Sequence, residues 1–510
     1  MNYAVIAAGE GARLAGEGIS DPKPLVPIQG KPMLVRLLDR MVAENAEVIS
    51  IIINPRMPEV RMILRVWQKS HPEVELRVCE QVTLSSMHSL SVMSEIIPKG
   101  KFVLTTVDTL FQPEEFHSFV QDWEQSDVGA DNALFGVTSF VDDEKPLWIN
   151  IAGDGCISEF ADEGPRPFVS GGIYALNTET AFPVLKTCIA SGQSRMRNFQ
   201  RALLADGLRI RAFEFSKIMD IDHAADIWKA EDWLSEGDRT LLVYRAAEFS
   251  PNSEQKDAAI LNAVGIRLAH QGIRVRAVSE TDLRVEHFKA VSRVFNMGRR
   301  QKTLLLLGQQ MQCNPELRVV NPPSGVQITA QSRSTTLELL DAAGVKVPRF
   351  WAYEPADDDL FQCEPELQQL LPGWVKGMHL SGVSAHDVEY VKTPLEADSG
   401  VIRLASSNYV DIVVMRHIQG ILLKVYCVLR PDGTIWMRWY APDQADMKQP
   451  EADPSCLSSM AQQIACALNL RVFGFDAILD VDGNLNVIDV NDWPSFSKFR
   501  DEAASEIAKL

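Results

Sequence analysis

The stretch Tyr3-Ala-Val-Ile-Ala-Ala-Gly-Glu-Gly-Ala-Arg-Leu14 decides the fold of the first half of the chain. Its first five residues are apolar and predict a buried β-strand, and the glycines after them predict a loop at the end of that strand. Glycine lets the backbone come close to a ligand and aim several N–H groups at one point. Such a loop can hold a phosphate, with Arg13 as a charge-assisted donor. A plain glycine-rich turn is the alternative.

Apolar runs alternate with amphipathic segments after this strand, a pattern typical of a mostly parallel sheet covered by helices. A polar stretch at 234–239 predicts a domain junction, after which the pattern restarts. From about residue 326 hairpins appear, which predicts an α+β part with antiparallel strands. The predicted helices are 33–44 and 257–271, and the predicted strands are 48–53, 102–107, 240–244 and 273–278.

Composition argues against several classes of protein. The 510 residues carry a formal net charge of −18, which disfavours a nucleic-acid backbone as the partner. No apolar run has the length of a membrane span, and the first residues lack the features of a signal peptide. Eight cysteines are scattered singly without a CxxC pair, as is typical of reduced thiols. We therefore expect a cytoplasmic protein that acts on small molecules, and assembly into homo-oligomers stays open.

Three short motifs occur together in the first half: the glycine loop with Arg13, then Lys23-Pro-Leu, then Gly30-Lys-Pro-Met. Together they resemble the signature of the sugar-phosphate nucleotidyltransferase family, whose α/β domain is doubly wound, Rossmann-like and GT-A-like. The resemblance implies a nucleotidyltransferase domain over residues 1–236. It also implies that Arg13 and Lys23 stabilise charge as pyrophosphate leaves. The residues implied to hold the nucleotide are Ala8, Gly9, Gly11, Arg13, Lys23, Ser86 and His88.

Acidic residues at two further places fit the same resemblance. Asp108 ends the buried strand at 103–108, at the edge where open α/β sheets bind ligands. Asp222 lies in a late acidic motif, closest to the form found in phosphocholine cytidylyltransferases, which favours CTP with UTP as the alternative. The resemblance implies that Mg²⁺ lies between Asp108 and Asp222, with Asp220 as the alternative to Asp222. Alone, each acid would instead be interpreted as a helix cap or a surface residue.

The contacts to the base and to the acceptor compound are implied by position alone. Ser86 and His88 lie in a segment that opens a helix and falls where the family reads the nucleobase. The small hydroxyl residues there could equally serve as N-caps. Gly171 and Gly172 match the segment near the acceptor phosphate compound, where glycine would allow a close approach.

The strongest local pattern lies near the C-terminus, where the Asp-Gly pair at 482–483 predicts a two-residue hairpin turn. In that register Asp476 lies opposite Asp489, and Asn491 shares their face two residues further on. Ile488 belongs to the apolar residues that flank these acids and make the strand half-buried. Two facing carboxylates repel each other without a counter-ion, so the pattern predicts a bound cation. A surface hairpin with its acids in solvent is the alternative.

This hairpin resembles the ATP-grasp superfamily, in which the same pattern binds Mg²⁺. The resemblance implies a Rossmann-like subdomain at 239–320 and an ATP-grasp domain at 321–510. It assigns Asp476, Asp489 and Asn491 to the metal, although the family usually has glutamate at the position of Asp489.

Other segments agree with this resemblance and imply the ATP contacts. Segment 379–386 is shaped like the mobile loop that covers the phosphates, and segment 413–420 lies where the family binds adenine. Arg333 stands where many members have a lysine, which keeps the charge but changes the geometry. Arg299, in the subdomain before, could meet an anionic substrate, but we expect it to be solvated. The residues implied to bind ATP are Arg333, Lys376, Arg416, Ile418 and Lys424.

The combination of the two halves leaves three hypotheses. The first is a bifunctional enzyme: an ATP-grasp kinase phosphorylates a sugar, polyol or similar alcohol, and the nucleotidyltransferase then couples the product to an NMP from CTP or UTP. The second replaces the kinase with a carboxylate–amine ligase. The third gives the C-terminal half a nucleotide-binding role without catalysis. Both catalytic schemes imply Mg²⁺ at two sites.

Overall fold

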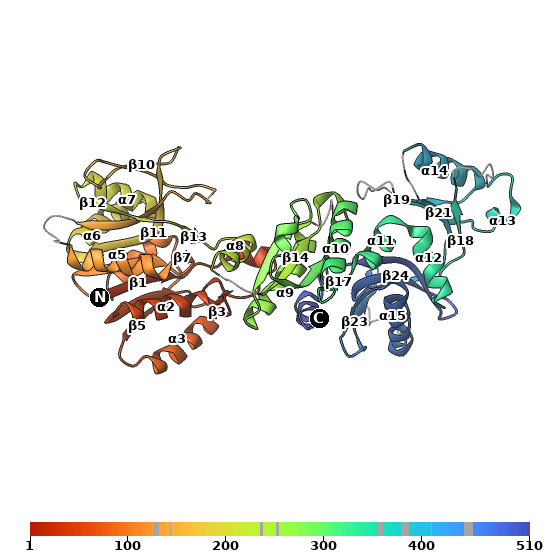
Figure 1. Cartoon of the computed structure of the whole chain (residues 1–510), viewed down its shortest axis with the longest axis horizontal. Coiled ribbons are helices and arrows are strands. Elements are labelled where there is room, and N and C mark those ends of the chain that lie inside the picture. The colour runs from red at the N-terminus through yellow and green to blue at the C-terminus, as the bar shows by residue number, and fades with distance from the viewer. Residues whose placement is uncertain are drawn as a thin grey trace. The chain divides into compact units, whose positions relative to one another are not determined.

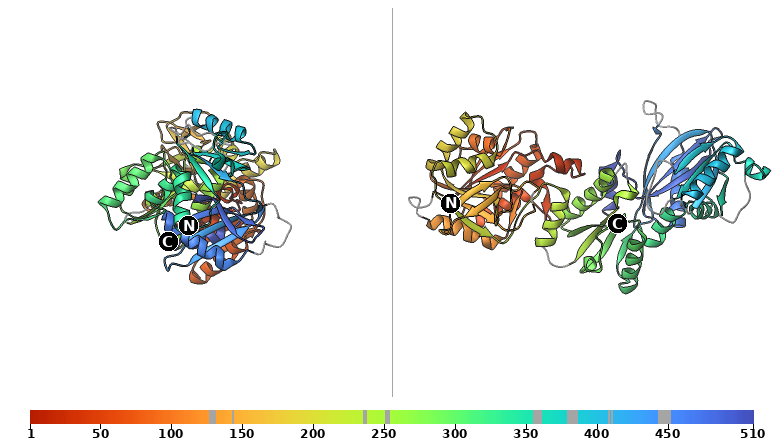
Figure 2. Two further views of the ribbon diagram at one scale, coloured as in Figure 1. Left: turned by 90° about the vertical axis from the view of Figure 1, so that its right-hand side faces the viewer. Right: turned by 90° about the horizontal axis from the view of Figure 1, so that it is seen from above.

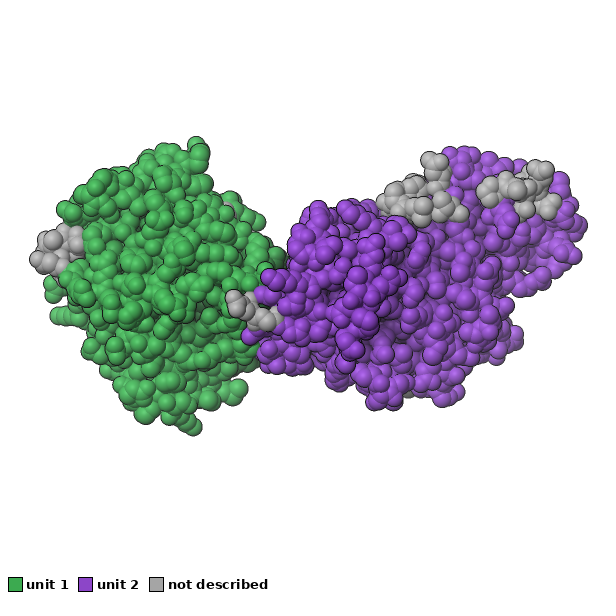
Figure 3. Space-filling view, viewed as in Figure 1, with its two compact units in different colours: residues 1–234 green, residues 235–510 purple. Residues whose placement is uncertain are grey.

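The structure, a computed structural model, describes residues 1–126, 132–142, 144–234, 238–250, 254–354, 361–378, 387–407, 409, 411–442 and 452–510. The chain divides into two compact units, Met1–Leu234 and Ser235–Leu510 (Figure 3). The expected junction at 234–239 falls at this division, with residues 235–237 outside the described ranges. All eight cysteines are free thiols, in agreement with the sequence.

The N-terminal unit is built on a nine-stranded sheet of described residues, whose strands β6, β1, β4 and β5 are parallel neighbours in that order. β11 runs antiparallel to β6 and links β8, β9, β10 and β12 to the sheet. The ribbons β2-β3 and β7-β13 lie outside it.

The strands of this unit are β1 (Asn2–Ala7), β2 (Pro27–Ile28), β3 (Lys31–Pro32), β4 (Val48–Ile53), β5 (Glu75–Glu80), β6 (Lys101–Thr106), β7 (Thr109–Phe111), β8 (Ala133–Thr138), β9 (Trp148–Ile151), β10 (Ile157–Ala161), β11 (Phe168–Asn177), β12 (Ile210–Phe215) and β13 (Ile218–Asp220). The helices are α1 (Ala12–Gly16), the 3-10 turn η1 (Lys23–Leu25), α2 (Met33–Ala43), α3 (Pro58–Ser70), α4 (Ser86–Met93), α5 (Pro113–Gln125), α6 (Thr178–Ala190), α7 (Met196–Ala205) and α8 (Ala224–Leu234).

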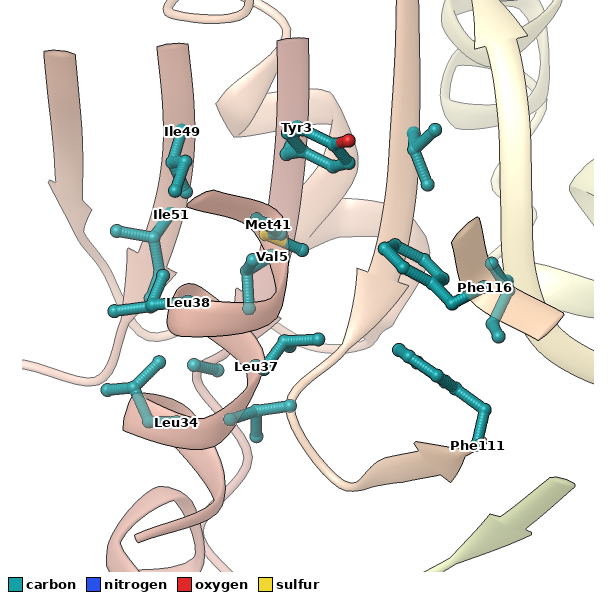
Figure 4. Close-up of a cluster of buried hydrophobic side chains, with 14 of the residues drawn as sticks. Tyr3, Val5, Leu34, Leu37, Leu38, Met41, Ile49, Ile51, Phe111 and Phe116 are labelled. Carbon is teal, nitrogen blue, oxygen red and sulfur yellow. The ribbon is translucent and has the colours of Figure 1, made fainter. Parts of the chain in front are cut away.

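The central strands are mostly apolar because the sheet is buried on both faces. Tyr3 and Val5 of β1 belong to one buried cluster, and Ala4 and Ile6 belong to another. Side chains of successive strand residues point to opposite faces, so the two clusters lie on the two sides of the sheet. Figure 4 shows apolar side chains of α2 lying over β1 and β4. Those side chains follow helical spacing and are Leu34, Leu37, Leu38 and Met41.

The C-terminal unit contains three four-stranded sheets within the described residues. The first, β15-β14-β16-β17, is parallel and agrees with the predicted restart of the α/β pattern. The other two, β18-β21-β19-β20 and β23-β22-β24-β25, are antiparallel, as predicted for the last third. α16 packs against α9, far away in the sequence (Figures 1 and 2). None of the described helices has the length and apolar character needed to cross a bilayer.

The strands of this unit are β14 (Arg239–Tyr244), β15 (Val275–Ser279), β16 (Val291–Asn296), β17 (Arg318–Val320), β18 (Phe350–Tyr353), β19 (Gly373–Met378), β20 (Val388–Val391), β21 (Asp411–Arg416), β22 (Gly420–Leu429), β23 (Ile435–Tyr440), β24 (Val472–Asp480) and β25 (Leu485–Asp492). The helices are η2 (Ala247–Phe249), α9 (Glu254–His270), η3 (Val285–Phe288), α10 (Gln301–Cys313), α11 (Pro323–Gln331), α12 (Arg333–Ala342), α13 (Pro365–Gln368), α14 (Pro394–Ser406), α15 (Pro454–Leu468) and α16 (Arg500–Ile507).

The β24–β25 hairpin brings Asp476 opposite Asp489, but not through the predicted two-residue turn. The Asp480 N–H donates to the Asn484 carbonyl at 2.9 Å, so the loop has three residues and Gly483 takes the left-handed conformation at φ 81°. This loop shifts the register by one residue. A bulge between the pairs Ala477–Val487 and Asp476–Asp489 shifts it back.

The cluster beneath α2 gives a stability prediction. Replacing the fully buried Leu38 with alanine should destabilise the N-terminal unit by about 2–5 kcal/mol, because a cavity replaces packed methyl groups. Met62 of α3 is 62% exposed, so Met62→Ala should change stability by less than about 0.5 kcal/mol. Calorimetric unfolding of the full chain measures both variants. Equal shifts of the unfolding transition would contradict the assignment of Leu38 to the core.

Candidate functional site

Asp108 and Asp222 meet because two short strands pair next to them. β7 begins directly after Asp108, and β13 ends at Asp220. The two strands are antiparallel with Thr109 opposite Asp220, and the Ile221 N–H donates to the Asp108 carbonyl at 3.1 Å. The ribbon therefore holds two segments that are more than 100 residues apart in sequence at the carboxyl end of β6.

The ammonium group of Lys23 lies between these two carboxylates. Nζ donates to Asp222 Oδ1 at 2.8 Å and also forms an ion pair with Asp108. Burial alone would lower the pKa of Lys23, but the Asp108 and Asp222 carboxylates raise it above its ordinary value. Lys23 is therefore a fixed positive charge at the end of the sheet.

The glycine loop packs directly against Lys23. Gly11 has φ 65°, and a Cβ atom added there would lie 2.9 Å from Lys23 Cβ. Only glycine suits this backbone angle and this close approach. Arg13 reaches Asp222 from the same loop, with Nη1 donating to Oδ2 at 3.0 Å, and its side chain is 60% exposed. The structure thus brings Gly11, Arg13, Lys23 and both acids together, and Arg13 stays accessible to a ligand.

A third carboxylate, Asp220, lies beside this group. Thr109 Oγ1 donates to Asp220 Oδ1 at 2.9 Å. The Asp220 side chain lines a cavity, and desolvation by the surrounding protein together with the Asp108 charge raises its pKa to about 7. The close approach of Asp108, Asp220 and Asp222 favours the binding of a cation between them. Among the described residues no three His, Cys, Asp or Glu side chains form a complete metal site, but Mg²⁺ commonly takes one or two carboxylates together with phosphate oxygens and water.

The remaining nucleotide residues of the N-terminal unit are more scattered. Ser85 caps α4, with its Oγ accepting from the His88 N–H at 3.4 Å and lying 2.9 Å from His88 Nδ1. Capping was thus the right interpretation of the serine at 85. Ser86 lines a cavity of ≈ 340 Å³, whereas His88 is not among its lining residues. Ala8 and Gly9 lie in the loop after β1, where Gly9 is exposed.

Gly171 and Gly172 line two neighbouring cavities. Gly172 borders the ≈ 340 Å³ cavity, and Gly171 borders one of ≈ 440 Å³ that also contains Arg13 and Asp222. Ser170 and Asp220 line both. The glycines therefore lie near Asp220, and their contact with the acceptor stays a prediction.

In the C-terminal unit, the two facing acids of the hairpin, Asp476 and Asp489, each have a cationic partner. Lys424 Nζ donates to Asp476 Oδ2 at 2.8 Å, and Arg333 Nη1 donates to Asp489 Oδ1 at 3.1 Å. Burial raises the pKa of Asp476, and Asp489 adds to the rise while Lys424 opposes it. The charge of Asp489 thus reaches Asp476, and a cation shared by the two acids stays a prediction.

Lys376 adds a third cation to this group. It is buried, and its Nζ donates to the carbonyl of Ile488, the residue at the bulge, at 2.9 Å. Burial lowers the pKa of Lys376, while Asp489 opposes the shift. Ile488 was expected to flank the acids as a half-buried strand residue. The structure agrees: Ile488 is half-buried in β25, and it lies at the bulge, where it lines a cavity.

That cavity, of ≈ 170 Å³, has an apolar side and a polar side. Val413 and Met415 of β21 belong to the apolar side, but Arg416 and Ile418 are not among the lining residues. The polar residues of the lining are Arg299, Arg333, Lys376, Asp387, Asp489 and Asn491, together with the hydroxyl groups of Thr329 and Thr336. The predicted covering loop at 379–386 lies outside the described residues.

Arg299 belongs to the site, contrary to the expectation that it is solvated. Its side chain is 13% exposed, and Nη2 donates to Asn491 Oδ1 at 2.8 Å. Arg299 also forms an ion pair with Asp492, which is fully buried. No sequence pattern singled out Asp492, because alternation placed it on the opposite face from Asn491. Its partners Arg245 and Arg299 lie in the segments that follow β14 and β16.

Comparison with known proteins agrees with the geometry of the first unit. The family described as "MobA-like NTP transferase domain" matches residues 3–162. The first half holds a nucleotidyltransferase domain. Bifunctional protein GlmU of Methanococcus maripaludis strain C7 is 25% identical over 237 residues, which is 46% of this chain and 54% of that protein. The protein from strain S2 is 24% identical over 238 residues, 46% of this chain and 54% of its own length. The chain thus spans about half the length of these curated relatives.

Solved structures similar to the nucleotidyltransferase domain include the inositol-1-phosphate CTP transferase from T. maritima. It is 17% identical, with a TM-score of 0.38, and the match covers 44% of this chain and 90% of that one. A UDP-glucose pyrophosphorylase complexed with UDP-glucose is 16% identical, with a TM-score of 0.38, over 46% of this chain and 97% of its own.

The cluster of Asp108, Asp220 and Asp222 in the nucleotidyltransferase domain gives a prediction for nucleotide binding. Asp108→Asn should weaken binding of CTP or UTP in the presence of Mg²⁺ by about 10–100-fold, because a charged ligand of the cation is lost. Asp206 is exposed at the end of α7, so Asp206→Asn should leave binding unchanged. Isothermal titration calorimetry measures both. Unaltered affinity in Asp108→Asn would remove Asp108 from the metal site.

Proposed function

We propose that the chain is a bifunctional enzyme that phosphorylates a small alcohol and then converts the product into a nucleotide conjugate. The nucleotidyltransferase domain would transfer CMP or UMP from CTP or UTP to a phosphorylated sugar, polyol or similar compound. The observation that carries this half of the proposal is Lys23, held between Asp108 and Asp222 at the carboxyl end of β6. The family match over residues 3–162 supports the same chemistry.

The reaction needs no covalent residue. A phosphate oxygen of the acceptor attacks the α-phosphorus of the NTP in line, the bond to the β-phosphate oxygen breaks, and pyrophosphate leaves. Lys23 and Arg13 offset the negative charge that gathers on the leaving oxygens. The loop at Gly11 fixes both cations relative to the sheet, so positioning contributes as well.

For the C-terminal unit we propose ATP binding in the ≈ 170 Å³ cavity. The apolar side, with Val413 and Met415, suits a purine ring, and Arg333 and Lys376 on the polar side suit phosphates. Asp476, Asp489 and Asn491 would hold Mg²⁺ here, as Asp108 and Asp222 would in the first domain. Mg²⁺ bound at either site supplies positive charge to the phosphates.

A kinase fits the fusion better than a ligase does, because a nucleotidyltransferase needs a phosphorylated acceptor. The alcohol oxygen would attack the γ-phosphorus, and ADP would leave. Lys424 lies beside the acids on the next strand, where it can neutralise the transferred phosphoryl group.

One experiment tests the whole proposal. The full chain is incubated with Mg²⁺, ATP, each of the four NTPs and a panel of alcohols, sugars and sugar phosphates, and mass spectrometry follows ADP, pyrophosphate and conjugates. We expect ADP with a phosphorylated alcohol, and pyrophosphate with a CDP or UDP conjugate. ADP that forms only when a carboxylic acid and an amine are both present would instead establish a ligase.

The nucleotidyltransferase domain yields an activity prediction. Lys23→Met should lower conjugate formation from a phosphorylated acceptor by about 10²–10³-fold, because it removes a preorganised charge from the leaving phosphates. Lys69→Met, at an exposed position of α3, is the matched control and should retain full activity. Pyrophosphate release measures both. A Lys23→Met enzyme with wild-type turnover would refute the assigned role.

The C-terminal unit yields a separate prediction. Asn491→Ala should lower ATP turnover by about 10–100-fold, because Asn491 would lose its oxygen contact to the metal and its bond with Arg299. Gln312 is exposed on α10, so Gln312→Ala is the control: it also removes a side-chain amide and should leave ATP turnover unchanged. ADP formation is the measurement. Retained turnover would leave the unit a nucleotide-binding domain without this metal site.

A further inference from the structure

A second cavity, of ≈ 460 Å³, lies beside the proposed ATP cavity in the C-terminal unit. The two cavities share three lining residues: Phe249, Arg299 and Asn491. Asp476 and Lys424 line the second cavity, whereas Asp489 lines the first. The facing acids of the hairpin therefore divide between the two cavities, and a molecule in the second would meet the phosphate end of a nucleotide in the first.

The walls of the second cavity carry more positive than negative side chains. The cations are Arg245, Lys256, Arg299 and Lys424, and the carboxylates are Asp257 and Asp476. Lys424 is neutralised by Asp476 at 2.8 Å, and Asp257 lies 3.7 Å from Arg245. Lys256 has no hydrogen bond or ion pair with any residue in the described ranges. Lys256 is thus a positive charge available to a ligand.

Two of these cations are fixed by one buried acid. Arg299 forms an ion pair with Asp492, and Arg245 Nη2 donates to the Asp492 carbonyl at 2.6 Å and lies 3.4 Å from Oδ2. Arg245 is buried and also donates to the Met297 carbonyl at 3.2 Å. Holding two guanidinium groups around a single carboxylate keeps them fixed on the cavity wall.

A loop in an unfavourable conformation also lines this cavity. Trp493 and Phe496 both have left-handed backbone angles, φ 56° and φ 50°, although neither is glycine. Such angles are unfavourable for residues other than glycine and persist where the surroundings enforce them, often at functional sites. Trp493 is fully buried, and its indole N–H has no hydrogen-bond partner among the described residues. Ser495 and Ser497 also line the cavity.

We propose that this second cavity binds the co-substrate of the C-terminal site, and that this co-substrate carries an oxyanion group, either a carboxylate or a phosphate or phosphonate. Lys256 and the serines would bind the oxyanion, and Arg299 and Asn491 would lie at the end nearest the nucleotide. The inference rests on the proposed use of ATP by this unit. Under the kinase scheme, it makes the phosphorylated alcohol an acidic one rather than a neutral sugar or polyol.

The test uses the full chain with Lys23→Met in the first domain, so that anion binding there is weakened. Ligand-observed NMR follows the methyl signals of methylphosphonate and of acetate at saturating Mg²⁺ and AMP-PNP, with glycerol as the uncharged control. We expect one oxyanion to bind alongside AMP-PNP more tightly than glycerol. Lys256→Met should weaken that binding about tenfold, as the loss of one charged hydrogen bond implies. If acetate binds more tightly, the oxyanion group of the co-substrate is a carboxylate; if methylphosphonate does, it is a phosphate or phosphonate.

Lys302 is exposed on α10 and does not line the cavity, so Lys302→Met is the matched control and should bind as the parent does. Thermal unfolding checks that the variants are folded. Anion binding that Lys256→Met leaves unchanged, or that AMP-PNP abolishes, would overturn the proposal. Binding that depends on Lys256 in a chain that does not bind AMP-PNP would support the oxyanion cavity and refute the proposed ATP use instead.

Discussion

The ammonium group of Lys23 organises the whole first site. A buried charge is unfavourable without partners, and this one is satisfied by two acids that lie more than 100 residues apart in the sequence. Its side chain is 11% exposed, so the glycine loop, the turn η1 and the β7-β13 ribbon must all be in place before the contact can form. Catalytic geometry and local folding therefore depend on the same ion pairs.

The second site follows the same electrostatic plan with different residues. Asp476 pairs with Lys424, and Asp489 pairs with Arg333, so the negative charge of each acid is compensated by a cation. A bound nucleotide would give the two cations phosphate oxygens as new partners and would leave the carboxylates to a divalent ion. In both units the basic side chains serve as counter-ions of the acids in the absence of a ligand, which explains how like charges can be kept close together.

Periodicity and motif spacing predicted much of the architecture but little of the long-range pairing. The strand at 48–53 is β4 itself, and the helix at 33–44 is α2 to within one residue, because both have strong apolar patterns. The β7-β13 ribbon was not predicted, since strands of three residues carry no readable period. The inward position of Arg299 depends on Asp492, almost 200 residues away, and no local pattern encodes that ion pair.

The bulge at Ile488 has a consequence for how the hairpin can vary among related chains. Before the bulge, Leu485 and Val487 point into the core; after it, Val490 does, while Asp489 and Asn491 line the cavities. The three-residue loop and the bulge shift the pairing in opposite directions, so they cancel. Losing one residue from either place alone would turn Asp489 away from Asp476. Insertions and deletions here can therefore be tolerated only as a compensating pair, which ties the length of an exposed turn to the chemistry at the far end of the strand.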